Sequence, residues 1–326
     1  MQAPEFWQSG KGGVLAELLA PLGWVYGLAT KVKLATTTPW TSPVPVLCVG
    51  NLIAGGAGKT PVALDLGMRL QAKGKNVHFL SRGYGGSEKG PLRVDPDIHD
   101  YSHVGDEPLM LATHGPAWVS SERRAGCMTA ANEGADIIIM DDGFQNPYIE
   151  KNFSIIVIDG GYGFGNAKMI PAGPLRESIP HGLSRAQSAV IIGDDDTGSG
   201  DTVTSCGLTP LRARLVPTPL PADIAGQPVI AFAGIGRPEK FFETVSSLDC
   251  TVASRIPFAD HHPYSEADIR HLDETAKKAG AHLLTTEKDA RRLPQSFLEQ
   301  ITVVPVHLEW SDEHAIEALL DQIDHD

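Results

Sequence analysis

Short apolar runs alternate with helical patterns along most of the chain. The runs typical of buried strands are Val44–Gly50, Asn76–Ser81, Ala117–Ser120, Asp136–Met140, Ser154–Asp159, Ala189–Ile192, Val229–Ala233, Thr251–Ile256, His282–Leu284 and Thr302–Val306. Helical stretches lie between most of them, for example Pro61–Lys73 and Ser265–Lys278. Strands separated by helices favour mainly parallel sheets with helices on both faces, so we predict an α/β fold.

The pattern changes in segment 209–227, where prolines surround an alternating stretch. We interpret this segment as a short linker that includes one or two strands. With 326 residues, the chain is longer than a single compact core usually supports. We therefore predict two α/β/α domains, a larger one at 36–208 and a smaller one at 228–326, preceded by an N-terminal segment at 1–35.

Apolar residues recur at helical spacing in segment 1–35, which predicts an amphipathic helix. They are Val14, Leu15, Leu18, Leu19, Leu22, Val25 and Tyr26. Glu17, Pro21 and two glycines interrupt the stretch, so its longest apolar run falls short of the roughly 20 residues that a bilayer span needs. Two interpretations stay open: a helix packed on its own domain, or a helix that lies in a membrane interface.

Composition narrows the function classes. The formal net charge of -13 argues against a nucleic-acid binder, because a phosphate backbone would be repelled at long range. An anionic substrate would therefore have to meet locally clustered arginines. The four cysteines lie far apart without a CxxC pair, which indicates buried thiols in a reducing compartment rather than disulfides or a zinc site.

Residues 50–61 read GNLIAGGAGKTP and follow a predicted strand. They end as a phosphate-binding loop does, although Ile53 stands where the usual first glycine belongs. The predicted nucleotide-binding residues are Ile53, Ala54, Gly55, Gly56, Ala57, Gly58, Lys59 and Thr60. The loop N–H groups and Lys59 suit phosphate oxygens, and the Thr60 hydroxyl suits Mg²⁺. This stretch therefore predicts a site for a nucleotide with Mg²⁺.

An acidic pair, Asp141 and Asp142, follows a buried strand and supplies the second half of such a site. Successive strand side chains point to opposite faces, so both acids reach one metal only if the strand ends there, and we keep both as candidates. The Asn-Lys-x-Asp motif of GTPases is absent from the sequence. Partitioning-type ATPases carry a lysine where this chain has Ala54. These two observations argue against both classes.

Eight ordered motifs together resemble the tetraacyldisaccharide 4'-kinase family, the lipid A 4'-kinases of Gram-negative bacteria. They read GNLIAGGAGKTP, LSRGYGG (80–86), VGDEP (104–108), DDGFQNP (141–147), PAGPLRE (171–177), AGIGRPEKFF (233–242), FADHHPYS (258–265) and TTEKDA (285–290). The resemblance extends from the N-terminal segment to about residue 293. The missing first glycine of the loop is also usual in that family.

The resemblance implies transfer of the γ-phosphoryl group of ATP to the 4'-hydroxyl of tetraacyldisaccharide 1-phosphate, giving lipid IVA. It implies ATP and Mg²⁺ as cofactors, a lipid A precursor as substrate, and the cytoplasmic face of the inner membrane as location. The N-terminal helix is then similar to a membrane-interface anchor. Two alternatives remain: a membrane-associated P-loop ATPase that acts as a switch or scaffold, and a small-molecule kinase. Protein partners are unknown.

The resemblance also implies roles for single residues. Asp106 corresponds to the base that accepts the sugar hydroxyl proton, assisted by His261, with His262 as a competing candidate. From the residues alone, GDEP reads as a helix start in which Asp106 is a cap. Asp141 and Asp142 correspond to the Mg²⁺ site. The expected lipid and phosphate contacts are Tyr84, Glu107, Arg123, Gln145 and Arg176, with Arg124 competing with Arg123 and Asn146 standing where many members have histidine.

Overall fold

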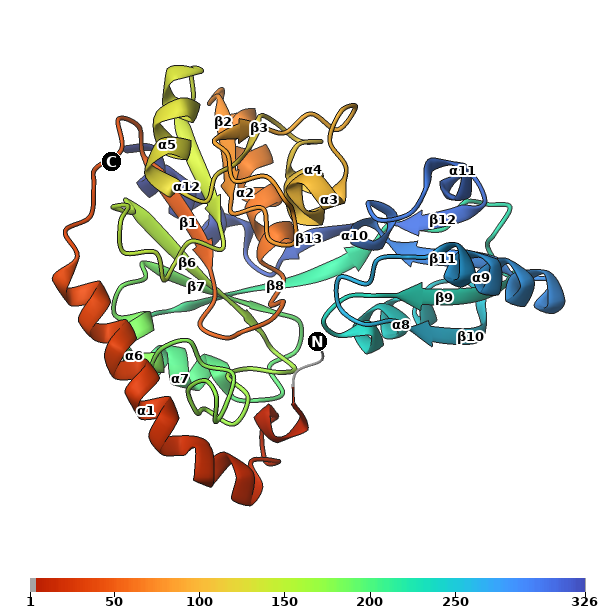
Figure 1. The fold of residues 1–326 in the computed structure, drawn as a ribbon, viewed down its shortest axis with the longest axis horizontal. Helices are drawn as coiled ribbons and strands as arrows, with labels where there is room; N and C mark the ends of the chain where they lie inside the picture. The colour runs from red at the N-terminus through yellow and green to blue at the C-terminus, as the bar shows by residue number, and fades with distance from the viewer. Residues whose placement is uncertain (1–3, 326) are drawn as a thin grey trace.

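The structure is a computed structural model that describes residues 4–325, and its two sheets confirm the predicted α/β class. Residues 1–3 and 326, at the ends of the predicted segments 1–35 and 228–326, lie outside the described residues. Figure 1 shows two lobes, with the larger sheet in one and β9 to β12 in the other. Helix α1 (Gly13–Thr36) lies along the edge of the larger lobe, away from the smaller one.

The larger unit is built on a nine-stranded sheet with the order β13-β8-β7-β6-β1-β5-β2-β4-β3. Its strands are β1 (Val46–Gly50), β2 (Val77–Ser81), β3 (Leu92–Arg93), β4 (Ala117–Val119), β5 (Ile137–Asp141), β6 (Phe153–Asp159), β7 (Ser188–Ile192), β8 (Pro210–Pro217) and β13 (Val306–Trp310). Among residues 4–325, the two edge pairs of this sheet, β13 with β8 and β3 with β4, are antiparallel and its other strand pairs are parallel. The central strands are buried on both faces, which explains their continuous apolar sequences.

Helices cover both faces of this sheet. They are α2 (Lys59–Ala72), α3 (Tyr101–Val104), α4 (Asp106–Leu111), α5 (Arg123–Asn132), α6 (Ile179–Leu183), α7 (Ser199–Ser205) and α12 (Glu313–His325), while the short 3-10 helix η1 (Glu5–Trp7) precedes α1. Helices α2, α4 and α12 pack on one face, and α5, α6 and α7 pack on the other. The loops at the carboxyl ends of the strands remain free to form a site.

The smaller unit has a four-stranded parallel sheet with the order β10-β9-β11-β12. Its elements are β9 (Pro228–Ala233), α8 (Pro238–Ser246), β10 (Thr251–Pro257), α9 (Glu266–Ala279), β11 (His282–Thr286), α10 (Glu287–Ala290), α11 (Gln295–Leu298) and β12 (Ile301–Val304). Helix α9 begins at a capping box made by Ser265 and Asp268, and it ends at Gly280 in the left-handed conformation.

The chain returns to the larger unit after β12, and this corrects the predicted boundaries. The run expected as one strand at 302–306 is divided by Pro305, and β13 then pairs with β8. Helix α12 places Ile316 and Leu320 in the core beneath α2. The predicted smaller domain at 228–326 therefore loses its last segment to the larger unit, and the predicted linker at 209–227 contributes β8 to the larger sheet.

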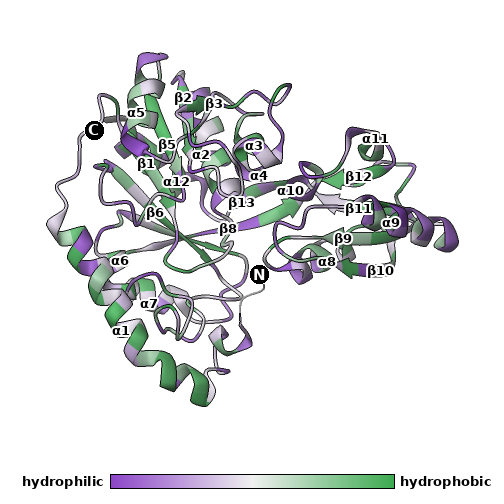
Figure 2. Ribbon diagram, in the orientation of Figure 1, coloured by the Kyte–Doolittle hydropathy of each residue, from purple (hydrophilic) through white to green (hydrophobic). Residues whose placement is uncertain are grey.

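Helix α1 runs through Glu17 and Pro21, which we expected to interrupt its apolar stretch. It is long and apolar enough to cross a membrane by length and composition, contrary to the shorter span expected from the sequence. The side of α1 that faces the protein carries small residues, of which Ala16 and Gly23 are buried. The outer side of α1 is apolar, with Val14, Leu15, Leu18, Leu22, Trp24, Val25, Leu28 and Val32 exposed. Figure 2 shows this helix green along most of its length, so it is less amphipathic than predicted.

Candidate active site

The glycine-rich loop joins β1 to α2 at the carboxyl end of the larger sheet. Gly58 has φ +86°, a conformation that side chains rarely adopt, and a Cβ atom there would meet Ile192 at 2.6 Å. The buried Asn51 closes the loop because its Nδ2 donates to the Gly55 carbonyl at 3.0 Å. A Cβ atom on Gly55 or Gly56 would meet nothing within 4 Å. The backbone of the loop is therefore open to a ligand.

The start of the glycine-rich loop, at Ile53 and Ala54, differs from that of the usual motif. Ile53, which replaces the first glycine, is buried and forms an antiparallel bridge with Leu175. The Ala54 N–H donates to the Pro174 carbonyl at 2.8 Å, and the Arg176 N–H donates to the Leu52 carbonyl at 2.8 Å. The PAGPLRE segment therefore fixes the start of the loop, which explains physically why both motifs occur together.

Lys59 and Thr60 begin α2 and face the end of β5, which lies next to β1 in the sheet. The Thr60 hydroxyl donates to Asp141 Oδ2 at 2.8 Å. Among the described residues, the buried Asp141 Oδ1 atom has no hydrogen-bond partner. Burial and the nearby Glu107 charge raise the pKa of Asp141 above its usual range. A buried carboxylate with a free oxygen beside a threonine hydroxyl fits the oxygen ligands that Mg²⁺ prefers.

Asp142 lies on the same side of the loop as Asp141 because its backbone takes a left-handed conformation, with φ +55°. Its carboxylate is 3.8 Å from Lys59 Nζ and accepts from both terminal nitrogens of Arg176, at 2.8 and 3.2 Å. Burial opposes its ionisation, but Lys59 and Arg176 outweigh burial and lower the pKa of Asp142. Both predicted acids therefore face the glycine-rich loop.

Gln145 and Arg176, two of the expected substrate contacts, join this acidic site through a side-chain network. Arg176 Nη1 donates to Gln145 Oε1 at 3.2 Å. Gln145 Nε2 in turn donates to the Asn51 carbonyl at 2.9 Å and to Glu177 at 3.1 Å. Glu177 is buried and accepts from Arg185 at 2.5 Å. Glu177 was not among the predicted site residues, although it stands inside the PAGPLRE motif.

Asp106 begins α4 in the larger unit, and its buried carboxylate meets a histidine of the smaller unit. Its Oδ1 accepts from the Glu107 N–H at 2.9 Å, while its Oδ2 lies 3.0 Å from His261 Nδ1. His261 has φ +56° in the loop after β10. His262 turns away and lies 3.0 Å from Asp268 instead. Of the two histidines, the structure therefore brings His261 to Asp106.

Two cations that the sequence analysis did not single out lie beside this pair. Lys288 Nζ is 3.1 Å from Glu107 and 3.4 Å from His261 Nε2, and Arg292 Nε is 3.4 Å from Asp106 Oδ2. Burial opposes the ionisation of Asp106, but the His261 hydrogen bond and the charges of Lys288 and Arg292 lower its pKa. Lys288 lies in α10 and Arg292 follows that short helix, so their spacing in the sequence gave no signal of this site.

Tyr84 is largely exposed, and its ring centroid lies 5.4 Å from that of His261. Arg123 points inward, where Nη1 donates to the Ser120 carbonyl and, among residues 4–325, Nε has no partner. Burial and the charge of Arg82 lower the pKa of Arg123.

The two ambiguous neighbours are engaged elsewhere. The Arg124 guanidinium lies 5.2 Å from the ring centroid of Trp40, away from the buried position of Arg123. Asn146 Oδ1 accepts from the Tyr148 N–H at 2.8 Å, which makes it part of a turn. Neither contact reaches the acids at the end of β5.

The smaller unit lies close to the glycine-rich loop. A Cβ atom on Gly236 would lie 3.8 Å from the Gly56 nitrogen. Arg237, the residue after Gly236, and Lys240 form ion pairs with the buried Asp159 at the end of β6, at 2.8 and 2.6 Å. The candidate site is therefore formed between the two units.

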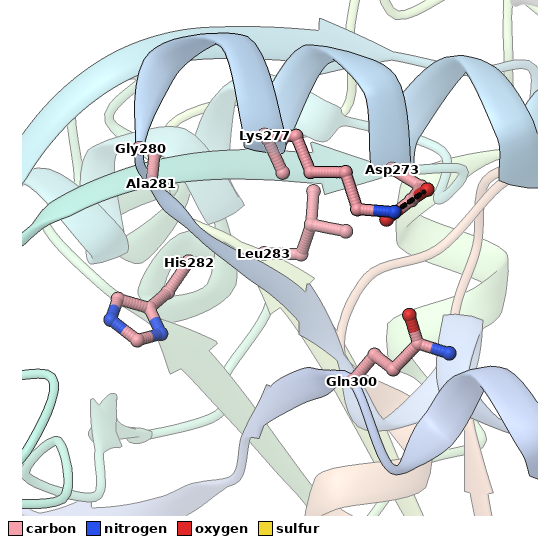
Figure 3. Close-up of a pocket in the computed structure, with 8 residues that line it drawn as sticks. Asp273, Lys277, Gly280, Ala281, His282, Leu283 and Gln300 are labelled. Carbon is pink, nitrogen blue, oxygen red and sulfur yellow. Dashed lines mark hydrogen bonds and ion pairs between the residues drawn. The ribbon is translucent and has the colours of Figure 1, made fainter.

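The cavity drawn in Figure 3 lies outside this site. It has a volume of about 300 Å³ and is lined by Asp273, Ala276, Lys277, Gly280, Ala281, His282, Leu283 and Gln300. These residues come from the last turns of α9 and from the amino ends of β11 and β12. Ligands of open parallel sheets bind at the opposite, carboxyl ends, where the His261 loop is found.

A strand-to-helix phosphate loop that faces an acid of the neighbouring strand is the arrangement of P-loop phosphotransferases. Here a second α/β unit brings His261 to Asp106 of the unit that carries this loop, which defines a two-unit P-loop kinase. Residues 15–324 match the family described as tetraacyldisaccharide-1-P 4'-kinase. The chain belongs to this family and is a kinase.

Individual relatives agree with this assignment. A tetraacyldisaccharide 4'-kinase of Rhodospirillum centenum is 49% identical over 324 residues, which cover 98% of this chain and 96% of the relative. One of Gluconacetobacter diazotrophicus is 51% identical over 321 residues, 98% of each chain. A crystal structure of LpxK from Aquifex aeolicus, described as a complex with ATP, is similar with a TM-score of 0.78 at 26% identity, covering 95% of this chain and 99% of that one.

Proposed function

We propose that this protein transfers the γ-phosphoryl group of ATP to the 4'-hydroxyl of tetraacyldisaccharide 1-phosphate, giving lipid IVA in lipid A biosynthesis. The observation that carries the proposal is the contact between Asp106 and His261 beside the glycine-rich loop and the two strand-end acids. Phosphoryl transfer asks a protein mostly for positioning and charge stabilisation, and these residues supply both. The relatives are tetraacyldisaccharide 4'-kinases by name, which supports this choice of acceptor.

The loop residues 53–60 hold the triphosphate in this proposal. The N–H groups of Gly55, Gly56 and Gly58 and the dipole of α2 attract phosphate oxygens, and the Lys59 ammonium reaches the transferred group. Thr60, Asp141 and Asp142 are the proposed ligands of Mg²⁺. When bound there, Mg²⁺ would neutralise charge on the phosphate oxygens.

Asp106 accepts the proton of the sugar hydroxyl as that oxygen forms its bond to phosphorus. The lowered pKa keeps Asp106 ionised at neutral pH, so it is an acceptor without prior deprotonation. A weak base suffices because the transition state of phosphoryl transfer is loose and the hydroxyl proton leaves late. His261 orients the carboxylate through Nδ1. Tyr84, Glu107, Arg123, Gln145 and Arg176 are proposed to surround the lipid head group and phosphates.

Helix α1 is proposed to lie in the interface on the cytoplasmic face of the inner membrane, where ATP is present. Its exposed apolar side is much larger than the scattered apolar residues of ordinary surfaces. Its inner side rests on Met169, near the segment that holds the start of the glycine-rich loop. This arrangement presents the site to a substrate that stays in the bilayer, and it disfavours a small soluble acceptor.

The test is a transfer assay with the purified full chain in detergent. It uses ATP labelled at the γ-phosphate, Mg²⁺ and tetraacyldisaccharide 1-phosphate, followed by separation of the lipids. We expect a labelled lipid with a phosphate on the 4' position, formed at least about 100-fold more slowly by an Asp106→Asn variant. ATP hydrolysis by the wild type without a labelled lipid would instead favour the switch or scaffold alternative and contradict the proposal.

A further inference from the structure

Arg292 is a buried arginine just after α10, and the mechanism above gives it no role. Its side chain is 1% exposed. Nη2 donates to the Gly234 carbonyl at 2.9 Å and to Asp289 Oδ1 at 2.8 Å, and Nη1 donates to the His262 carbonyl at 3.1 Å. The guanidinium therefore ties together the loop after β9 and the loop that carries His261.

A further contact of Arg292 crosses to the larger unit. Nε, which also donates to the Lys288 carbonyl at 3.5 Å, lies 3.4 Å from Asp106 Oδ2. The same Oδ2 atom lies 3.0 Å from His261 Nδ1. The other oxygen of Asp106 accepts from the Glu107 N–H. Both oxygens of this carboxylate are thus engaged, and two of the three groups on it come from the smaller unit.

Arg292 has more carboxylate partners than it needs to hold the two loops of the smaller unit together. Asp289 is fully buried and also accepts from Tyr264 and the Gly234 N–H, at 2.7 and 2.8 Å. Asp289 and Arg292 therefore form a buried ion pair within the smaller unit. Asp106 is a second carboxylate, from the larger unit, beside the same guanidinium. A residue that only held the loops of the smaller unit would not need this second ion pair.

We propose that Arg292 is a positioning residue for phosphoryl transfer, which fixes the His261 loop and the Asp106 carboxylate relative to one another across the boundary between the units. This inference rests on the proposed function, in which Asp106 accepts the hydroxyl proton. Arginine suits the task because its planar fork serves several acceptors at once, whereas a lysine keeps the charge without that geometry.

The proposal predicts a loss in turnover with little change in ATP affinity, since the glycine-rich loop belongs to the other unit. A misplacement of about 1 Å costs on the order of 100-fold in rate. We expect Arg292→Gln to lower kcat about 100-fold and Arg292→Lys to recover part of it, with the KM for ATP changed less than about threefold. Arg291→Gln removes the neighbouring charge and is expected to behave as wild type.

The experiment measures kcat and KM for ATP in the lipid transfer assay for these variants, together with Asp106→Asn and the double variant Asp106→Asn with Arg292→Gln. If Arg292 acts through Asp106, the double variant turns over like Asp106→Asn alone. Thermal unfolding is followed in parallel, and if Arg292→Gln does not fold, Arg292→Lys carries the comparison, alone and with Asp106→Asn.

The outcomes are distinct. The inference is overturned if the Arg292→Gln variant turns over as fast as the Arg291→Gln control. If Arg292→Gln does not fold, the same comparison is made with Arg292→Lys. This outcome leaves the proposed function standing. The inference is also overturned if the Arg292 substitution lowers kcat by the same factor in the Asp106→Asn background as in the wild type, because the effect is then independent of Asp106. Wild-type turnover of Asp106→Asn contradicts the role of Asp106 as proton acceptor, and a wild type that makes no phosphorylated lipid contradicts the proposed function itself, whatever the Arg292 variants show.

Discussion

The Nδ1 atom of His261 lies 3.0 Å from the Oδ2 atom of Asp106, although 155 positions separate the two residues. Asp106 belongs to the unit that carries the glycine-rich loop, and His261 belongs to the other unit. The pair therefore exists only while the two units lie together as they do here. This makes the proposed proton acceptor depend on closure of the protein.

Replacing Asp106 by asparagine keeps the size of the side chain and removes the proton acceptor. General base catalysis contributes about 100-fold to 10,000-fold, and we expect a loss of lipid phosphorylation in that range. Binding of Mg·ATP is expected to persist because the phosphate loop is untouched. Titration calorimetry and the transfer assay measure these two quantities. Full turnover by Asp106→Asn would leave the residue as a helix N-terminal carboxylate only.

The adjacent histidines provide a matched pair of variants. His261→Ala removes the contact with Asp106, so we expect kcat to fall at least tenfold while the protein stays folded. His262 instead contacts Asp268, whose pKa is lowered to about 2 by hydrogen bonds from Ser265 and His262. His262→Ala is expected to keep kcat and to weaken the start of α9. Equal losses of kcat in both variants would contradict the assignment of His261.

The outer side of α1 is expected to bind lipid. Leu18 and Val25 are exposed there, and burial of such side chains in an apolar phase contributes about 1.5 to 3 kcal/mol each. Leu18→Glu together with Val25→Glu should therefore weaken binding to vesicles of phosphatidylethanolamine and phosphatidylglycerol by more than about tenfold. Met68→Glu, at an exposed apolar position of α2, is the control. Unchanged flotation of the double variant with vesicles would contradict the interfacial role.

The C-terminal helix is expected to stabilise the larger unit. Leu320 is fully buried in the cluster that contains Leu66 and Leu70 of α2. Truncating a buried leucine typically costs about 2 to 5 kcal/mol, so Leu320→Ala should lower the free energy of unfolding by that amount. Leu28→Ala, at an exposed position of α1, should change it by less than about 0.5 kcal/mol in detergent. Denaturant unfolding measures both, and a similar small effect of Leu320→Ala would contradict this packing.

The strand and helix pattern predicted the fold class because buried parallel strands carry an unmistakable apolar signal, as in Ile137–Met140. It did not predict that Val306–Trp310 leaves the smaller sheet. Pairing between β13 and β8 joins residues about 90 positions apart, and local periodicity carries no information on such a return. The alternating pattern after Pro210 was visible, but a linker strand and an edge strand of a sheet look alike in sequence.

For the site, the residue types gave the phosphate loop and the acids, since their chemistry and spacing are local. The role of Ile53 was hidden, because only the bridge to Leu175 explains why a buried side chain serves at that position. Lys288 and Arg292 were missed for a related reason. Their partners, Glu107 and Asp106, lie in the other unit, and a contact between two units leaves no periodic trace in either segment.

The loop ending in Lys59 and Thr60 is proposed to bind Mg·ATP together with Asp141 and Asp142. Titration calorimetry of Mg·ATP tests it, with wild type, Lys59→Ala, and Lys277→Ala as a control for loss of one exposed charge on α9. We predict at least about 100-fold weaker binding for Lys59→Ala and none of this loss for Lys277→Ala, since charge-assisted contacts to phosphate contribute about 3 kcal/mol. Equal affinity of Lys59→Ala and wild type would contradict the account.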